Sequence, residues 1–370
     1  MGQKCHTRSL AAVFVVNKGG FTMHKVGIVG FGGMANWHFD LIKELDGIEV
    51  VGIWDTAPKP REKAVEKGVI AFESREALLA DESINIVLIA TPNDVHKEIA
   101  IEAMRAGKNV VCEKPVTLNS VDLKAMIDAS EETGKLFTVH QNRRWDEDFL
   151  MVCKMIEDNS LGEVFGIESR VHGSRGIPGD WRALKEHGGG MVLDWGVHMF
   201  DQICMMFPGV KIKTVHSILT TVTNELVDDG FRTELLLDNG VRVLVEVGTS
   251  NFVTLPRWYV QGLNGTAVIE DWDKSGKIVI AVGENEKDIV PIKTAAGLTK
   301  TMAPRRDDSI KELPLPVVTA DIKDFYKNVM ATIEGKEEIL VKLPEIARVM
   351  RLMEAVFESA EKNEVIRFED

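Results

Sequence analysis

Short apolar runs alternate with helical patterns along the first 140 residues, and this alternation constrains the fold more than any other feature. The clearest strand-like runs are KVGIVG, IEVVGIWD, INIVLIA, KNVVCEK and KLFTVH. A strand that leads through a helix to another strand is typical of parallel sheets with right-handed crossovers. We therefore predict an α/β fold that begins with a doubly wound parallel sheet of the Rossmann type.

The pattern changes after His140, where longer strand-like segments follow one another. These segments are VFGIESRVHG, KIKTVHSILTTVT, FRTELLLDNGVRVLVEVG, WYVQGLNGTAVIED and KIVIAVG. They predict one large sheet, flanked by helices at 146–159, 191–206, 319–334 and 344–362, with a surface loop at 301–318. Because 370 residues exceed what one core usually covers, we predict a Rossmann domain at 23–142 and a second domain at 143–370, whose last helix packs back on the first.

The first 22 residues contain an apolar run from Leu10 to Val16, which is similar to a weak secretion signal. The run is short, and no small-residue cleavage site follows it. A strand begins directly after Met23, and the codons of Lys18-Gly19-Gly20 could encode a ribosome-binding site. We therefore expect Met23 to be the natural start and residues 1–22 to be a disordered or non-native extension.

The charge and the cysteines narrow the class of partner. A formal net charge of −13 argues against nucleic acid or an anionic membrane surface, because both attract basic patches. The four cysteines have no metal-binding spacing, so we expect reduced thiols, no metal and a cytoplasmic location.

A glycine-rich turn between the first strand and the first helix predicts a dinucleotide site. It consists of Gly30, Phe31, Gly32, Gly33, Met34 and Ala35, and it matches G-x-G-x-x-G/A. The helix that follows offers free N–H groups to a pyrophosphate. Asp55 ends the second strand 20 residues after Ala35, where its carboxylate can bind the ribose hydroxyls. This favours NAD, while Lys59 and Arg61 leave NADP open.

Two further loops follow strands of the same sheet and are expected at its ligand-binding edge. One contains Thr91, Pro92 and Asn93, with His96 at the start of the next helix. The other contains Glu113 and Lys114, followed by Pro115. From spacing alone, Lys114 fits either the cofactor crevice or an ordinary solvated loop.

The segment GGGMVLDWGVHMFD, residues 188–201, carries Asp194 and His198 inside an otherwise apolar helix. Side chains four residues apart share one helix face, so these two groups are expected to project together. A buried structural pair is the alternative to a catalytic acid–base pair.

Taken together, GFGGMA, TPN-D-V-H, EKP and GGG-x-x-x-D-x-x-x-H resemble the Gfo/Idh/MocA family of oxidoreductases, over about residues 24–362. The resemblance implies a C-terminal α/β domain with an open, mostly antiparallel sheet that forms a homo-oligomer interface. It implies catalytic roles for Lys114, Asp194 and His198. It also implies cofactor contacts from Asn142, Trp181 and Arg182.

The resemblance implies an NAD(P)-dependent dehydrogenase acting on a secondary hydroxyl of a sugar, glycoside or cyclitol. A narrower hypothesis is that the hydroxyl is the one at C3 of a glucoside. We expect His198 as the acid–base group, Lys114 as its partner in proton transfer and Asp194 as the orienting group, although Lys114 and His198 could exchange roles. Two alternatives stay open: a glycoside hydrolase or lyase that forms a transient 3-keto sugar, and a non-catalytic dinucleotide-binding sensor.

Overall fold

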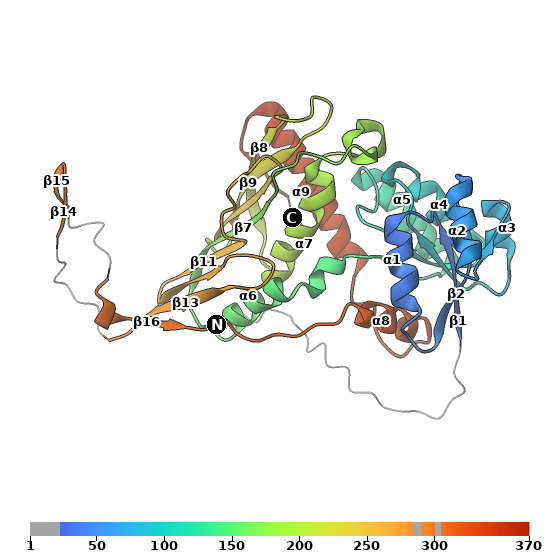
Figure 1. Cartoon of the computed structure of the whole chain (residues 1–370), viewed down its shortest axis with the longest axis horizontal. Coiled ribbons are helices and arrows are strands. Elements are labelled where there is room, and N and C mark those ends of the chain that lie inside the picture. Colours follow the sequence, from blue (N-terminus) through green and yellow to red (C-terminus); the bar gives the residue numbers. More distant parts are fainter. Residues whose placement is uncertain (1–22, 284–290, 300–304, 370) are drawn as a thin grey trace.

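The computed structural model describes residues 23–283, 291–299 and 305–369, which are organised around two sheets (Figure 1). The predictions for the N-terminal extension fall on residues 1–22, outside the described residues, and stay predictions. Among the described helices, none has the length and apolar character that a membrane span requires.

The N-terminal sheet has six parallel strands in the order β3-β2-β1-β4-β5-β6, as the alternating pattern predicts. Its strands are β1 (His24–Val29), β2 (Ile48–Trp54), β3 (Ile70–Ala71), β4 (Ile86–Ile89), β5 (Asn109–Cys112) and β6 (Phe137–Val139). Strand β4 is buried at every position, because helices cover both faces of the sheet. The strand order reverses between β1 and β4, and such reversals open a crevice at the carboxyl ends of the strands.

Five helices connect these strands. They are α1 (Gly33–Ile42), α2 (Pro58–Glu66), α3 (Arg75–Ala80), α4 (His96–Arg105) and α5 (Ser120–Thr133). Local signals set several of their ends: Asn119 caps α5 by accepting a hydrogen bond from the Asp122 N–H, and Gly134 ends it in the left-handed conformation.

The second sheet has nine strands in the order β16-β13-β12-β11-β7-β10-β9-β8-β17. Neighbouring strands are antiparallel except β10 and β7, which run parallel. Its strands are β7 (Val164–His172), β8 (Ile212–Thr220), β9 (Gly230–Leu237), β10 (Arg242–Gly248), β11 (Trp258–Gly262), β12 (Gly265–Ile269), β13 (Gly276–Ala281), β16 (Ile310–Leu313) and β17 (Ile366–Arg367). The structure therefore shows the predicted large, mostly antiparallel sheet.

One expectation for this region is wrong. The stretch 301–318 is not a loop throughout, because β16 (Ile310–Leu313) pairs with β13 at the sheet edge. The adjacent hairpin of β14 (Ile292–Thr294) and β15 (Gly297–Thr299) forms a separate two-stranded sheet that stands apart from the body in Figure 1.

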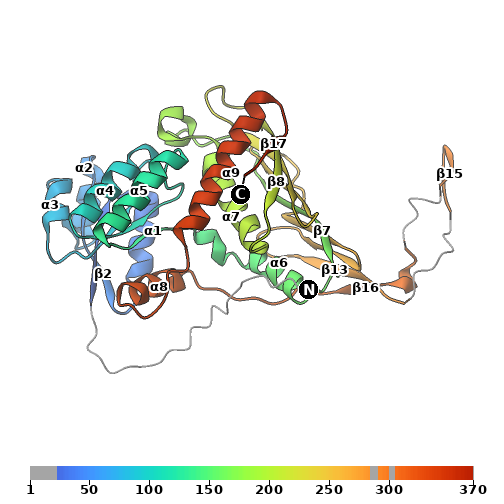
Figure 2. The same ribbon diagram turned by 180° about the vertical axis from the view of Figure 1, so that it is seen from behind.

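Helices α6 (Glu147–Glu157), α7 (Val197–Met206) and α9 (Leu343–Lys362) lie on one side of the large sheet, between it and the Rossmann part (Figures 1 and 2). Helix α9 also touches α5 and β6. The N–H of Ser120 in α5 donates to Glu354 in α9 at 2.7 Å, and the hydroxyl of Thr138 in β6 donates to the carbonyl of Val341, just before α9, at 3.2 Å. Helix α8 (Lys323–Ile333) packs against α1. The end of the chain therefore ties both parts together.

Candidate active site

Lys114 and Asp194, predicted from distant motifs, meet in the structure. Lys114 lies just beyond β5, and its Nζ donates to Asp194 Oδ1 at 2.9 Å and to the Asp194 carbonyl oxygen at 3.0 Å. Arg182 Nε lies 3.3 Å from the other carboxylate oxygen, Oδ2. The Asp194 carboxylate is thus held between two cations, one from each half of the chain.

The segment that carries Asp194 differs from the predicted continuous helix. Residues Val192–Gly196 form a π-helical turn, and α7 begins only at Val197. Single π-turns occur frequently at functional sites because they re-aim side chains. Asp194 is therefore displayed from a widened turn, with His198 in the first turn of the α-helix after it.

Gly190 and Asp228 fix the start of this turn. Gly190 has φ +102°, and a Cβ there would lie 2.2 Å from Asp228 Oδ1. The other Asp228 oxygen accepts the Val192 N–H at 2.8 Å, and its backbone carbonyl accepts the Met191 N–H at 3.0 Å. The glycine run thus allows a buried carboxylate to hold the segment that presents Asp194.

Burial and the nearby charges shift the pKa values of both Asp194 and His198. Burial alone would raise the pKa of Asp194, but the cations Lys114 and Arg182 outweigh it and hold that pKa below its usual value. Burial lowers the pKa of His198 well below its usual range, and the charges of Lys114 and Arg143 act in the same direction. His198 is therefore a neutral imidazole near pH 7. Its Nδ1 is buried and has no hydrogen-bond partner among the described residues.

An aromatic wall adjoins His198. The Trp195 ring lies 6.2 Å from the His198 ring and 6.0 Å from the ring of Trp272, which is 48% exposed. The Arg143 guanidinium lies 4.2 Å from the centre of the Trp195 ring and 5.1 Å from that of the Trp272 ring. Trp145 is mostly buried against Phe325, although one edge borders a groove of about 390 Å³ that Trp272 also lines.

The glycine turn fits a dinucleotide. Gly30 has φ +85°, and a Cβ there would lie 2.7 Å from the Ala90 carbonyl oxygen. Gly32 and Gly33 face open space, since a Cβ on either would meet nothing within 4 Å. No side chain caps α1 at Gly32, so the helix N-terminus is available to a phosphate. Ala35 is fully buried and permits the close helix–strand contact that the motif requires.

Asp55 reaches the same turn. Its Oδ2 accepts the Phe31 N–H at 2.7 Å and its Oδ1 the Ala57 N–H at 2.8 Å, and both oxygens keep lone pairs for a ribose. In the next loop, Asn93 is buried and donates to the Gly188 carbonyl at 3.3 Å, which links this loop to the glycine run.

The remaining predicted contacts differ in exposure. Thr91 Oγ1 and Asn142 Oδ1 are buried without hydrogen-bond partners among the described residues, and Met34 is 38% exposed. Arg182 stacks on Trp181, its guanidinium 4.6 Å from the ring.

Three side chains predicted to contact the cofactor are enclosed instead. Phe31 is buried with its ring against Phe39, so only its backbone faces the turn. His96 is fully buried, with Nε2 2.9 Å from the Thr91 carbonyl oxygen and Nδ1 3.1 Å from that of Pro115. Glu113 is buried between two histidines. We therefore reassign these three side chains from cofactor contact to positioning.

Replacing Asp228 with asparagine is expected to make the protein more stable at about pH 8. Burial raises the pKa of Asp228 to about 7, far above its value in an unfolded chain. The folded state then binds more protons between about pH 4 and 7, so stability falls as the pH rises through that window. Thermal midpoints across this range should fall less steeply in the variant. Exposed Asp273→Asn is the control, and parallel curves for Asp228→Asn and wild type would contradict the prediction.

Comparisons with known proteins identify the class. The model of an oxidoreductase family with an NAD-binding Rossmann fold matches residues 24–141, and that of the GFO/IDH/MocA C-terminal domain matches residues 149–268. The chain belongs to the Gfo/Idh/MocA family of oxidoreductases.

Particular relatives span nearly the whole chain. The crystal structure of an NAD-binding protein from Listeria innocua is 48% identical, with a TM-score of 0.91 over 94% of this chain and 100% of that one. The scyllo-inositol 2-dehydrogenase (NADP(+)) of Bacillus subtilis is 26% identical over 93% of this chain and 96% of its own. An aldose-aldose oxidoreductase structure from Caulobacter crescentus, 20% identical, has a TM-score of 0.74 over 93% of this chain and 99% of that one, which shows the shared fold.

Proposed function

We propose that this protein transfers hydride between a nicotinamide dinucleotide and a secondary hydroxyl of a sugar, glycoside or cyclitol. The observation that carries the proposal is the Lys114–Asp194 ion pair beside a buried, neutral His198, at the carboxyl edge of a sheet with a dinucleotide turn. The similarity to a scyllo-inositol dehydrogenase supports a polyol as the substrate. The indoles of Trp195 and Trp272 support it too, since such rings pack well against the apolar faces of sugars.

The dinucleotide, when bound, takes up or supplies the hydride; the chain's own residues handle the proton. His198, neutral near pH 7, accepts the proton of the substrate hydroxyl. The Lys114 ammonium donates a hydrogen bond to the same oxygen as its negative charge grows. Asp194 holds that ammonium in place, with Arg182 on its other oxygen.

We propose NAD as the preferred cofactor. A carboxylate at the end of β2 accepts hydrogen bonds from ribose hydroxyls and repels a 2′-phosphate, and Asp55 stands there beside the glycine turn. The Bacillus relative is named for NADP, so the two cofactors need direct comparison.

Two measurements test the proposal. The first is to denature the purified chain and identify any released nucleotide, and to measure binding of NAD and NADP if it is empty. A protein that neither holds nor binds a dinucleotide would refute the cofactor role. The second is to assay NAD reduction with cyclitols and glucosides. Free sugar released without net reduced nicotinamide would point instead to elimination through a 3-keto sugar.

We further propose that the chain forms a homo-oligomer through the open face of the large sheet. Strand β9 turns Arg232, Glu234 and Leu236 outward on this face, and Leu236 is 38% exposed. Leu236→Asp would place a charge in the interface and is expected to lower the molar mass measured by light scattering. Val121→Asp, which alters an exposed apolar residue on α5, should leave that mass unchanged. A monomeric wild type would overturn the proposal.

A further inference from the structure

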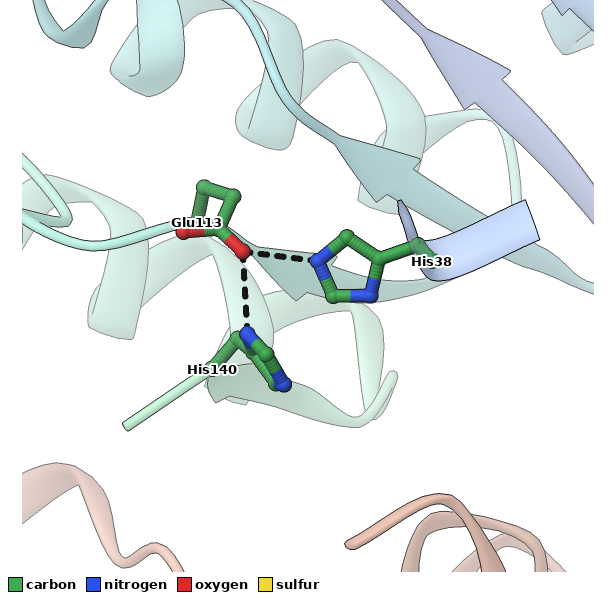
Figure 3. Close-up of side chains that lie close together, drawn as sticks. All are labelled: His38, Glu113 and His140. Atoms are coloured by element: carbon green, nitrogen blue, oxygen red, sulfur yellow. Dashed lines mark hydrogen bonds and ion pairs between the residues drawn. The ribbon is translucent and has the colours of Figure 1, made fainter. Parts of the chain in front are cut away.

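A buried chain of hydrogen bonds lies directly behind Lys114. Glu113 Oε1 lies 2.7 Å from His38 Nε2 and 2.9 Å from His140 Nδ1, as Figure 3 shows. The Tyr326 hydroxyl lies 2.7 Å from the other nitrogen of His38, Nδ1. Glu113 follows β5, His38 lies in α1, His140 follows β6 and Tyr326 lies in α8, and all four side chains are buried.

The bonding pattern fixes where the protons lie. Burial would raise the pKa of Glu113, but its bonds to His140 and His38 hold that pKa well below the usual value, so the carboxylate is ionised. An ionised carboxylate only accepts hydrogen bonds, so His38 carries its proton on Nε2 and His140 on Nδ1. Burial lowers the pKa of His38 to about 4. Its Nδ1 is therefore bare and accepts from Tyr326.

A metal ion is the rival explanation, because two histidines and a carboxylate lie within 4.8 Å of one another. Ligand atoms around a tetrahedral zinc ion stand about 3.3 Å apart, given metal–ligand distances near 2.0–2.1 Å. The separations of 2.7 and 2.9 Å are those of direct hydrogen bonds instead. The tyrosine bond to His38 also completes the network without an ion.

The network is joined to the candidate site through Lys114. The second oxygen of Glu113, Oε2, accepts the backbone N–H of Lys114 at 3.1 Å. The same carboxylate raises the pKa of His198 against the larger lowering by burial and Lys114. The titratable groups around Glu113 are His38, His96, Cys112, Lys114, His140, His198 and Tyr326. Glu113 supplies the negative charge at the centre of these groups, and the Lys114 ammonium is the positive charge next to it.

We propose that Glu113, held ionised by His38 and His140, is a positioning residue that fixes the backbone at Lys114 and places a permanent negative charge behind the proton-transfer groups. The role in catalysis rests on the proposed function. The arrangement of protons does not, because it follows from contacts in the chain without any ligand.

The first experiment needs no substrate, and it uses variants only to assign the signals. Nitrogen NMR of histidine-labelled wild-type protein at about pH 8 should report an Nε2–H tautomer for His38 and an Nδ1–H tautomer for His140, assigned with His38→Gln and His140→Gln spectra. The opposite tautomer at either ring, or stoichiometric metal found by elemental analysis, would overturn the proposal. A wild type that oxidises no polyol would refute the proposed function and leave this result standing.

The second experiment separates charge from shape. Glu113→Gln removes the charge, so protonated groups nearby lose stabilisation. The acid limb of the kcat/KM profile, which reports protonation of His198, should then move to lower pH by about half a unit or more, because the Glu113 charge raises the pKa of His198. Glu113→Asp keeps the charge but shortens the side chain, which moves the carboxylate away from the Lys114 backbone. We therefore expect kcat to fall about tenfold, while the limb of the kcat/KM profile stays at its wild-type pH.

Tyr326→Phe is the matched control, because it alters the same buried network without changing its charge. Its acid limb should coincide with that of the wild type. If Glu113→Gln leaves the limb in place, or if Tyr326→Phe moves it equally, the charge role is overturned. Should Glu113→Gln fail to fold, the tautomers and the Glu113→Asp profile decide the proposal.

Discussion

Replacing Lys114 with methionine is expected to lower kcat for polyol oxidation by about 10²- to 10⁴-fold, the range that a positioned proton-transfer group contributes. Methionine keeps most of the side-chain volume and removes the ammonium that binds both Asp194 Oδ1 and the Asp194 carbonyl. The substrate oxygen then loses its charged donor, and Asp194 keeps only Arg182. Steady-state kinetics over a range of pH measures the loss, and calorimetric titration measures dinucleotide binding.

The dinucleotide should still bind within a few-fold of wild type, because the glycine turn and Asp55 are unchanged. Lys124→Met removes an exposed lysine that pairs with Asp128 on α5 and should keep full activity. A Lys114→Met enzyme within threefold of wild-type kcat would exclude the proposed role. Equal loss of activity, dinucleotide binding and thermal midpoint would assign Lys114 to the structure of the fold.

The sequence predicts the N-terminal fold well because its signals are local. Apolar runs of strand length, a glycine turn between strand and helix, and caps such as Asn119 and Gly134 each act within a few residues. The parallel sheet follows from their alternation. For the second sheet, the local pattern predicts that one large sheet forms but not the order of its strands. Pairing between distant strands, such as the parallel contact of β10 with β7, leaves no local signature.

Deviations from prediction occur where tertiary contacts override local pattern. Strand β16 lies in a Pro-rich, charged stretch and becomes a strand because β13 offers an open edge. The π-turn at Val192–Gly196 depends on Asp228, which lies 36 residues from the N–H it accepts. Neither feature could be read from hydrophobic spacing.

In the candidate site, too, local sequence predicts some residues, while others are set by tertiary contacts. The four-residue spacing of Asp194 and His198 and the EKP motif predict candidate site residues, but the partners of these residues come from elsewhere in the chain. Arg182, expected at the cofactor, pairs with Asp194. His38 and His140 lie 75 and 27 residues from the Glu113 carboxylate they bind. Only the EKP glutamate, a charge next to a buried strand, signalled that partners were needed.

Replacing Arg144 with methionine is expected to destabilise the protein by about 3–5 kcal/mol, the cost of breaking a buried ion pair. Arg144 lies between the two parts of the chain and donates to both Asp201 oxygens, from Nε at 2.7 Å and Nη2 at 2.6 Å. Its Nη1 donates to Glu345 on α9 at 2.7 Å. The variant leaves the Asp201 carboxylate buried and unpaired inside α7, the helix that carries His198.

The pH dependence identifies the cause of that loss. Burial raises the pKa of Asp201, and Arg144 opposes this, so removing the arginine raises that pKa further. An acid with a raised folded-state pKa loses stability as the pH rises through it, so the deficit of Arg144→Met should be larger at about pH 8 than at about pH 5. Urea unfolding at both values measures it. Arg144→Met combined with Asp201→Leu removes the unpaired charge and should recover most of the loss. A double variant as unstable as the single one would show that Arg144 stabilises the protein by packing and not by neutralising Asp201.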